Sequence, residues 1–211
     1  TQETGLGRFW DYSANAREGN AQSYSQLMSA TQALIALNVL EAYEFGRHRM
    51  VMDIGGGQGT FLSAVGAAHP GLELVLVDLP AVAGLAERRP GLQLRIEPRD
   101  MLREPLPEGA DLITLIRVVH DHDDRPVRLL LSSIRRALAP GGRLLIAEPM
   151  AGVKGAGAMA DAYFGMYLWA MGRGSPRSAN ELTGFLKEAG FRQVRRLKTA
   201  EPLLVSALLA G

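Results

Sequence analysis

The chain has 211 residues, of which 47% are hydrophobic and 21% charged, and its formal net charge is +1. This composition is that of a folded domain with one core and excludes a disordered chain. The near-zero charge offers no basic surface to nucleic acid, so a small molecule is the expected partner. The absence of cysteine excludes disulfides and thiolate metal sites and fits the cytoplasm, where we expect the protein. No apolar run is long enough to span a membrane.

Short apolar runs alternate along the chain with longer mixed segments. Apolar residues at helical spacing predict a long helix over residues 22–45. Runs rich in Val, Ile and Leu then predict strands buried on both faces, at 50–54, 72–77, 92–96, 112–118 and 143–147. Helical patterns separate these strands at 60–68, 81–88 and 125–138. The alternation is typical of a doubly wound α/β fold with a parallel sheet.

The last part of the chain predicts a different ending for the sheet. A helix is expected over 180–189, followed by apolar runs at 191–197 and 203–209 with a turn around Pro202 between them. These two runs can pair as an antiparallel hairpin. The complete prediction is a Rossmann-like, seven-stranded sheet that is mostly parallel and has a C-terminal antiparallel strand. Ligands of such sheets lie beyond the carboxyl ends of the strands.

A glycine-rich turn, Met52-Asp-Ile-Gly-Gly-Gly-Gln-Gly59, follows the first strand and opens a helix. Gly55, Gly57 and Gly59 carry no side chain, so a ligand can approach the backbone closely. A dinucleotide site would have its third glycine where Thr60 stands. The spacing therefore favours S-adenosylmethionine over NAD as the cofactor.

Residues at the next two strand ends complete the predicted cofactor site. Asp78 closes the second strand, nineteen residues after Gly59, and can accept both ribose hydroxyls. Asp100 and Met101 follow the third strand and can meet an adenine, the acid at the exocyclic amine and the thioether against the ring. Each feature alone also suits a tight turn or a helix cap, but the joint spacing favours a cofactor.

Two segments resemble a known family of S-adenosylmethionine-dependent O-methyltransferases, the caffeic-acid and acetylserotonin type. The segment Tyr24-Ser-Gln-Leu-Met-Ser29 and its helix resemble the helix that precedes the glycine turn in that family. Arg117-Val-Val-His-Asp121 resembles the Arg/Lys-x-x-His-Asp segment that holds the family's catalytic histidine. Within the family, the helix around Met28 is similar to that of bacterial enzymes that methylate the tertiary hydroxyl of hydroxylated carotenoids.

The resemblance implies a reaction and a set of roles. The reaction is methyl transfer to a small apolar hydroxylated molecule, which a membrane can supply. The catalytic residues would be His120 as general base, its neighbour Asp121, and Glu148, which orients the base. The cofactor contacts would be Gly55, Gly57, Asp78, Asp100, Met101 and Arg117. Tyr24 and Met28 would form part of the substrate wall.

The chain departs from this family at two positions. His122 stands where the family has a tryptophan, and Pro176 stands where plant members place a second glutamate beside the base, which leaves the base less supported. Family members also carry an N-terminal helical domain that dimerises and closes the substrate pocket. We therefore expect residues 1–45 to be a linker and the last helix of such a domain, residues 46–211 to form the cofactor-binding catalytic domain, and the full-length protein to be a homodimer.

Other interpretations stay open. The segment 158–172 is apolar nearly all round, which suits a core or the seat of another domain, but its Met159 and Tyr163 also suit an apolar substrate. The histidines and acids of 120–124 have no distant fourth ligand, so we expect no metal. The alternative functions are C-methylation of a tetrapyrrole and binding of the cofactor or a partner without turnover.

Overall fold

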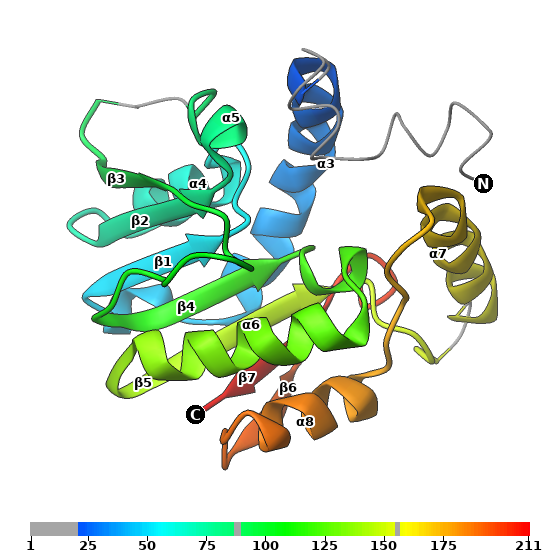
Figure 1. The fold of residues 1–211 in the computed structure, drawn as a ribbon. Helices are drawn as coiled ribbons and strands as arrows, with labels where there is room; N and C mark the ends of the chain where they lie inside the picture. The colour runs from blue at the N-terminus through cyan, green and yellow to red at the C-terminus, as the bar shows by residue number, and fades with distance from the viewer. Residues whose placement is uncertain (1–20, 87–89, 155–156) are drawn as a thin grey trace.

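The computed structural model describes residues 21–86, 90–154 and 157–211. They form one seven-stranded sheet with helices on both faces (Figure 1). The strands are β1 (Met50–Ile54), β2 (Glu73–Asp78), β3 (Gln93–Pro98), β4 (Ala110–Ile116), β5 (Leu138–Glu148), β6 (Val194–Leu197) and β7 (Ser206–Ala210). Their order across the sheet is β3-β2-β1-β4-β5-β7-β6. Strands β1 to β5 pair in parallel, whereas β7 is antiparallel to both β5 and β6.

Helices connect the strands and extend beyond the sheet. They are α3 (Ala21–Ala42), α4 (Thr60–Ala68), α5 (Pro80–Ala83), α6 (Asp124–Ala137), α7 (Gly157–Met171) and α8 (Ala179–Glu188), with the short 3-10 turns η1 (Phe45–Arg47) and η2 (Val119–Asp121). The predicted fold class is confirmed, including the antiparallel hairpin at the C-terminal end. It could be predicted because strands buried on both faces are apolar along their whole length.

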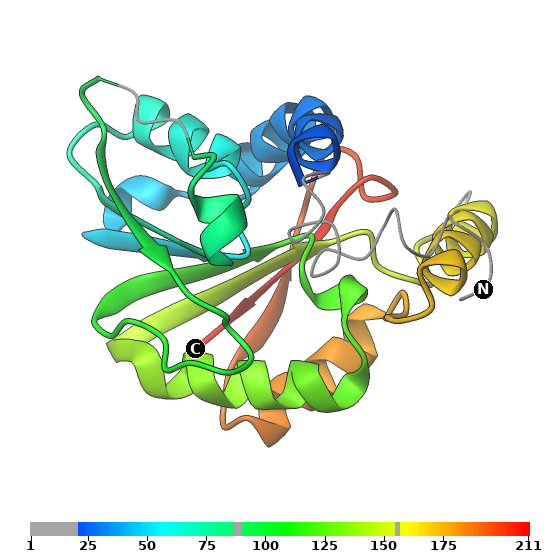
Figure 2. The same ribbon diagram turned by 45° about the horizontal axis from the view of Figure 1, so that its top comes forward.

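Neighbouring residues of a strand point to opposite faces, so the sheet has a hydrophobic layer on each side. On one face, Met52 of β1 belongs to a cluster that includes Leu131 of α6 and residues of α8. On the other face, Val51 of β1 packs in a cluster with Phe61 of α4 and Ile35 of α3. Figure 2 shows the sheet between these two groups of helices. The strands are therefore held from both sides, and the carboxyl ends of the parallel strands β1 to β5 share one edge.

Some element boundaries differ from the prediction. The expected helix over 81–88 is only α5, because Gly84 follows it and glycine is a poor helix former; residues 87–89 lie outside the described chain. The fourth strand, expected to reach residue 118, ends at Ile116, because Arg117 adopts a left-handed conformation with φ +58°. The fifth strand begins earlier than expected, at Leu138.

The helix α3 ends earlier than the predicted segment and is followed by η1. Ile35 and Val39 are buried in the same cluster as α4, so this part of α3 belongs to the core of the sheet domain. Leu34 and Leu37, on the other side of the helix, are more than half exposed. Residues 1–20 lie outside the described chain, and the division into 1–45 and 46–211 stays a prediction.

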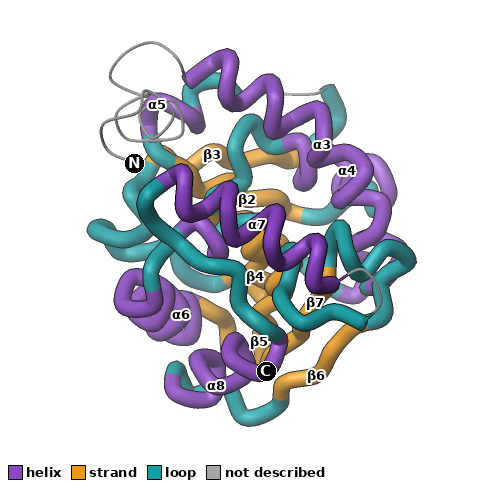
Figure 3. Tube along the Cα trace, turned by 90° about the vertical axis from the view of Figure 1, so that its right-hand side faces the viewer, coloured by secondary structure: helices purple, strands orange, loops and turns teal. Residues whose placement is uncertain are grey.

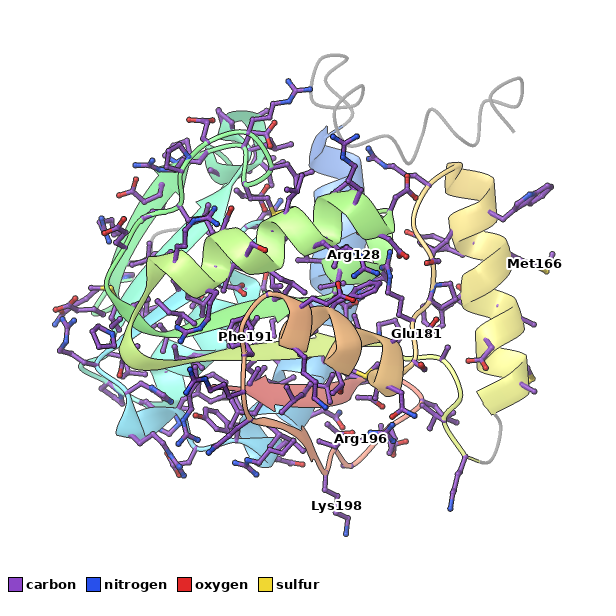
Figure 4. The ribbon with its side chains drawn as sticks, turned by 60° about the horizontal axis from the view of Figure 1, so that its bottom comes forward. Arg128, Met166, Glu181, Phe191, Arg196 and Lys198 are labelled. Carbon is purple, nitrogen blue, oxygen red and sulfur yellow. The ribbon has the colours of Figure 1, made fainter. Side chains whose placement is uncertain are left out.

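The helix α7 stands beyond the carboxyl ends of the strands, apart from the sheet (Figures 1 and 3). Its large apolar side chains are mostly exposed, among them Met159, Tyr163, Met166 and Trp169. Met166 points away from the sheet domain (Figure 4). Among the described helices, α7 included, none has the length and apolar character to cross a membrane.

Candidate functional site

The carboxyl ends of β1, β2, β4 and β5 carry most of the predicted site residues. Figure 3 views the sheet from this side. The residues fall into two groups along the edge. The first group surrounds the glycine turn after β1 and the end of β2, and the second surrounds the turn η2 after β4 and the end of β5.

The glycine turn has the backbone shape that the motif predicts. Gly55, Gly57 and Gly59 all have positive φ, at 72°, 61° and 82°. A side chain at Gly55 would come within 2.8 Å of Val118, whereas no atom of the described residues lies within 4 Å of the place of a side chain at Gly57. Gly55 is therefore required by packing as well as by its φ, and the space beside Gly57 is open for a ligand.

Asp78 closes the turn from the neighbouring strand. One oxygen of its carboxylate accepts a hydrogen bond from the Gly57 amide at 2.7 Å, and the other accepts one from the Leu79 amide at 2.7 Å. Burial raises the pKa of Asp78 to about 6, although both amides oppose the shift. The side chain is only partly buried, so it can still meet a ligand. Together the open turn and this acid fit a ligand that has ribose hydroxyls.

Asp53 lies beneath the glycine turn and is not among the predicted site residues. Its carboxyl is fully buried; Oδ1 accepts a hydrogen bond from the Thr114 hydroxyl at 2.6 Å, and Oδ2 has no partner among the described residues. Burial raises the pKa of Asp53 to about 7, and the negative charge of Asp78 adds to the shift. A charged residue inside an apolar strand was the available signal. Its environment could not be predicted, because Thr114 comes from another strand.

Asp100 has a local structural role. Its Oδ1 accepts a hydrogen bond from the Leu102 amide at 3.0 Å, and its Oδ2 lies 3.5 Å from the Arg103 guanidinium. Met101 is partly buried and packs against the core cluster that contains α6. Both residues follow β3 at the predicted edge, but their contacts are those of a capped turn. Their contact with an adenine stays a prediction.

The second group centres on His120, which is 5% exposed and lies in η2. Its Nδ1 donates a hydrogen bond to Oε2 of Glu148, the last residue of β5, and its Nε2 lies 3.3 Å from Oδ1 of Asp121. Burial disfavours the imidazolium, but the negative charges of Asp121 and Glu148 outweigh burial and raise the pKa of His120. His120 is thus in contact with both of the other predicted catalytic residues.

The conformation of Arg117 makes this arrangement possible. Its positive φ turns the chain sharply after β4, which brings the amides of the next residues toward β5. Val118 and Val119 donate backbone hydrogen bonds to Glu148 Oε1 at 2.8 and 2.6 Å. Glu148 is therefore an acceptor on both oxygens. Arg117 lies between the two groups of site residues, and its role toward a cofactor stays a prediction.

Two of the predicted substrate contacts, Met159 and Tyr163, lie on α7, and their role toward a substrate stays a prediction. Met159 and Tyr163 are 73% and 67% exposed on α7. The side chains of Tyr24 and Met28 lie outside the described residues. A narrow gap beside His120, lined also by Glu148, Pro149 and Leu182 among others, has no room for a water molecule and is not a substrate pocket.

A family model described as an O-methyltransferase domain matches residues 2–192. The chain belongs to this family. Among its relatives, demethylspheroidene O-methyltransferase of Rhodobacter capsulatus is 40% identical over 99% of this chain and 54% of the relative. The enzyme of the same name from Cereibacter sphaeroides is also 40% identical, over 99% of this chain and 57% of the relative.

Solved structures show the same fold. The human N-acetylserotonin methyltransferase, crystallised with S-adenosylmethionine, superposes with a TM-score of 0.84 at 27% identity, over 94% of this chain and 58% of that one. The chain spans about half the length of these O-methyltransferase relatives. The family resemblance found in the segments 24–29 and 117–121 is confirmed.

The first prediction concerns Asp78. In the full-length protein, Asp78→Asn should weaken binding of S-adenosylhomocysteine by roughly 1 to 3 kcal/mol, because ribose hydroxyls would lose a charged acceptor. Calorimetry measures the affinity. Glu73→Gln, at the opposite end of the same strand, is the matched control and should leave affinity unchanged. Equal affinity of wild type and Asp78→Asn, or micromolar competition by NAD, would contradict the cofactor assignment.

The second prediction concerns Asp53 and pH. Because its folded pKa is raised to about 7 from 3.8, the folded protein keeps a proton that the unfolded chain loses, so stability falls as pH rises between these values. The slope for one such group is on the order of 1.4 kcal/mol per pH unit. Asp53→Asn cannot ionise, so its free energy of unfolding should fall less between pH 5 and pH 8 than that of the wild type. Asp78 contributes a slope of the same sign up to about pH 6 in both proteins.

Denaturant unfolding at the two pH values measures this effect. Glu181→Gln is the control, because hydrogen bonds from the hydroxyl and the backbone amide of Ser178 lower the pKa of Glu181. A lowered pKa affects stability only below the ordinary value, so this variant should lose the same stability at pH 5 and pH 8. An Asp53→Asn difference that does not change with pH would show that Asp53 ionises normally.

Proposed function

We propose that this chain is the catalytic domain of an S-adenosylmethionine-dependent O-methyltransferase that uses His120 as general base on a hydroxyl of a hydroxylated carotenoid. The observation that carries the proposal is the buried His120–Glu148 pair at the same sheet edge as the open glycine turn. One edge thus offers a proton acceptor beside a cradle for a nucleoside. The relatives' name supports the reaction and the substrate class.

The residues around the glycine turn fit S-adenosylmethionine. Asp78 can accept ribose hydroxyls, and the open space at Gly57 admits an amino acid end, whose ammonium can meet backbone carbonyls. When bound, this cofactor supplies an electrophilic methyl group, so the protein has only to position the acceptor oxygen and remove its proton. The complex of the human relative with S-adenosylmethionine supports this assignment.

The acidity of the acceptor decides what the base can do. A phenol with a pKa of about 10 is roughly 3.5 units above an ordinary histidine, a gap of about 5 kcal/mol. For an aliphatic alcohol, with water's 15.7 as a rough guide, the gap is about 9 units or around 12 kcal/mol. A free alkoxide therefore does not form first on a tertiary hydroxyl. His120 would take the proton while the methyl group is transferred.

Glu148 prepares His120 for this role. Its carboxylate accepts the hydrogen bond from Nδ1, which selects the tautomer whose Nε2 can accept a proton. It also stabilises the imidazolium that forms. Nδ1 is bonded to Glu148, so a substrate hydroxyl would have to approach Nε2. Asp121 lies near this same nitrogen. We include Asp121 in the catalytic group because its charge adds to the basicity of His120.

The third prediction tests the reaction and the base together. The full-length protein, supplied with S-adenosylmethionine and a panel of hydroxylated carotenoids, should form a methyl ether that mass spectrometry detects. His120→Ala should lower kcat by about 10²- to 10⁴-fold with little change in cofactor affinity. Glu148→Gln should lower kcat less, because the imidazole stays in place. His69→Ala, remote from the site, is the control.

Other outcomes separate the alternatives. A C-methylated tetrapyrrole in place of an ether would replace the proposed reaction with the alternative of C-methylation. Cofactor binding with no product from any acceptor would favour a protein that binds without turnover. Near wild-type kcat in His120→Ala would show that the base is elsewhere or that positioning alone suffices.

We further propose that the full-length protein is a cytoplasmic homodimer, with the exposed side of α7 in its interface. Large apolar side chains gather there, and such surfaces on soluble domains mark contacts with other chains or domains. The fourth prediction is that Met166→Glu combined with Trp169→Glu shifts the protein from dimer to monomer in sedimentation velocity. Leu129→Glu, an exposed leucine on α6, should leave the dimer intact. A monomeric wild type would contradict the proposal.

A further inference from the structure

Residues 174–178, called the strap here, connect α7 to α8 and cross the turn that carries His120. The amide of Ser175 donates a hydrogen bond to the His120 carbonyl at 3.0 Å, and the amide of Gly174 donates one to Asp123 Oδ1 at 3.0 Å. Gly174 has φ +80°, and a side chain there would come within 2.2 Å of the same His120 carbonyl. The backbone of the strap thus lies directly against the backbone of His120.

Arg177 extends this contact with a buried guanidinium. Its side chain is 4% exposed, and Nη1 donates a hydrogen bond to the Val119 carbonyl at 2.9 Å. Nη2 donates to the His122 carbonyl at 2.7 Å and to Asp124 Oδ1 at 2.8 Å, and Nε donates to the same Asp124 oxygen at 3.0 Å. A planar guanidinium can satisfy several acceptors in fixed directions at once, which lysine cannot do. The two carbonyls that Arg177 binds lie on either side of His120.

Glu148 binds the N–H groups of one short segment, and Arg177 binds its carbonyl groups. Glu148 accepts hydrogen bonds from the amides of Val118 and Val119 and from the imidazole of His120. Arg177 donates hydrogen bonds to the carbonyls of Val119 and His122. Both charged side chains are at least 95% buried. The backbone of η2 is therefore fixed from its donor side by a carboxylate and from its acceptor side by a guanidinium.

We propose that Arg177 is a positioning residue for His120, a proposal that rests on the proposed role of His120 as base. By fixing the backbone on both sides of His120, Arg177 keeps the imidazole aligned with Glu148 and with the acceptor oxygen. A base displaced by a fraction of an ångström loses much of its effect, because proton transfer requires hydrogen-bond distance. Arg177 itself does not touch the reacting atoms. It stands next to Pro176, where plant members of the family have their second glutamate. In this chain Arg177 supports the base through the backbone on either side of His120.

The fifth prediction is a double-mutant cycle in the full-length protein. Arg177→Met should lower kcat by about 10- to 100-fold, with affinity for S-adenosylhomocysteine within about twofold of wild type. The kcat of Arg177→Lys should lie between those of wild type and Arg177→Met, because lysine keeps the positive charge but lacks the planar guanidinium that binds several acceptors at once. In a His120→Ala background, Arg177→Met should have almost no further effect on kcat, because the base it positions is gone.

If Arg177 had a structural role but did not position His120, the two backgrounds would give a different result. If Arg177 only joined α8 to the sheet, its substitution would lower kcat by the same factor in both backgrounds, and this outcome would overturn the proposal. Full kcat in Arg177→Met would overturn it as well. If His120→Ala alone keeps wild-type kcat, the proposed base fails first, and the two failures are therefore distinguishable.

Arg128→Met is the matched control. Arg128 lies on α6 (Figure 4). It forms an ion pair with Glu188 of α8 and stacks over the Phe185 ring, 3.9 Å from its centroid. Arg177 lies 5.7 Å from the centroid of the same ring. The control removes the same charge beside the same aromatic side chain but leaves the His120 segment untouched. It should keep wild-type kcat.

Hydrogen exchange gives a readout that needs no substrate. In Arg177→Met, peptides covering 117–123 should exchange about 10-fold faster or more, because the opening of a segment that has lost two hydrogen bonds costs less free energy. Peptides covering the glycine turn 53–60 should exchange as in wild type. In Arg128→Met both regions should be unchanged. Wild-type exchange over 117–123 in Arg177→Met would show that Arg177 does not hold this segment and would overturn the proposal.

Discussion

The second group of site residues depends on the way in which one buried carboxylate is satisfied. Glu148 ends β5 and is 2% exposed, so an unpaired charge there would be very costly. Two backbone amides and an imidazole supply its hydrogen bonds, and all three come from the segment after β4. Parallel pairing of β4 with β5, with Ile116 opposite Ala147, brings that segment beside the carboxylate. The left-handed conformation of Arg117 then turns the amides toward it, so strain at one residue is offset by three hydrogen bonds.

In the first group of site residues, backbone amides also satisfy one carboxylate, that of Asp78, but a second carboxylate, that of Asp53, has fewer partners. Asp78 also accepts backbone amides, and it fixes the glycine turn as Glu148 fixes η2. Within the part of the chain that the structure describes, Asp53 beneath the turn has one hydroxyl as a side-chain partner, and its other oxygen has none. Its pKa is accordingly raised further than that of Asp78, to about 7, and it can be held as a neutral acid. A cationic ligand near this pair of acids would favour their ionised forms, so affinity and protonation are linked at this end of the site.

The sequence predicted what local patterns determine and missed what distant contacts determine. The sheet, the glycine turn and the segment 117–121 were predictable, because apolar runs and motif spacing are local features. The role of Arg177 was not, because its partners lie more than fifty residues away and nothing around it marks a buried arginine. The capping box of Ser178 and Glu181, directly after it, indicates only where α8 begins. Asp100 shows the reverse case, since its spacing suits a cofactor while its contacts are those of a local turn.

The raised pKa of His120 limits how the base can work. Two carboxylates near one imidazole make it a stronger base, and each unit of pKa narrows the gap to an alcohol by about 1.4 kcal/mol. The same carboxylates favour the protonated imidazolium, which cannot accept a proton. At a pH below the pKa of His120, each further unit of that pKa therefore removes about nine tenths of the neutral imidazole. Basicity alone therefore gives little net gain toward an aliphatic hydroxyl. What remains is alignment of a neutral imidazole with the acceptor oxygen at the moment of transfer, and this is what a backbone fixed from both sides provides.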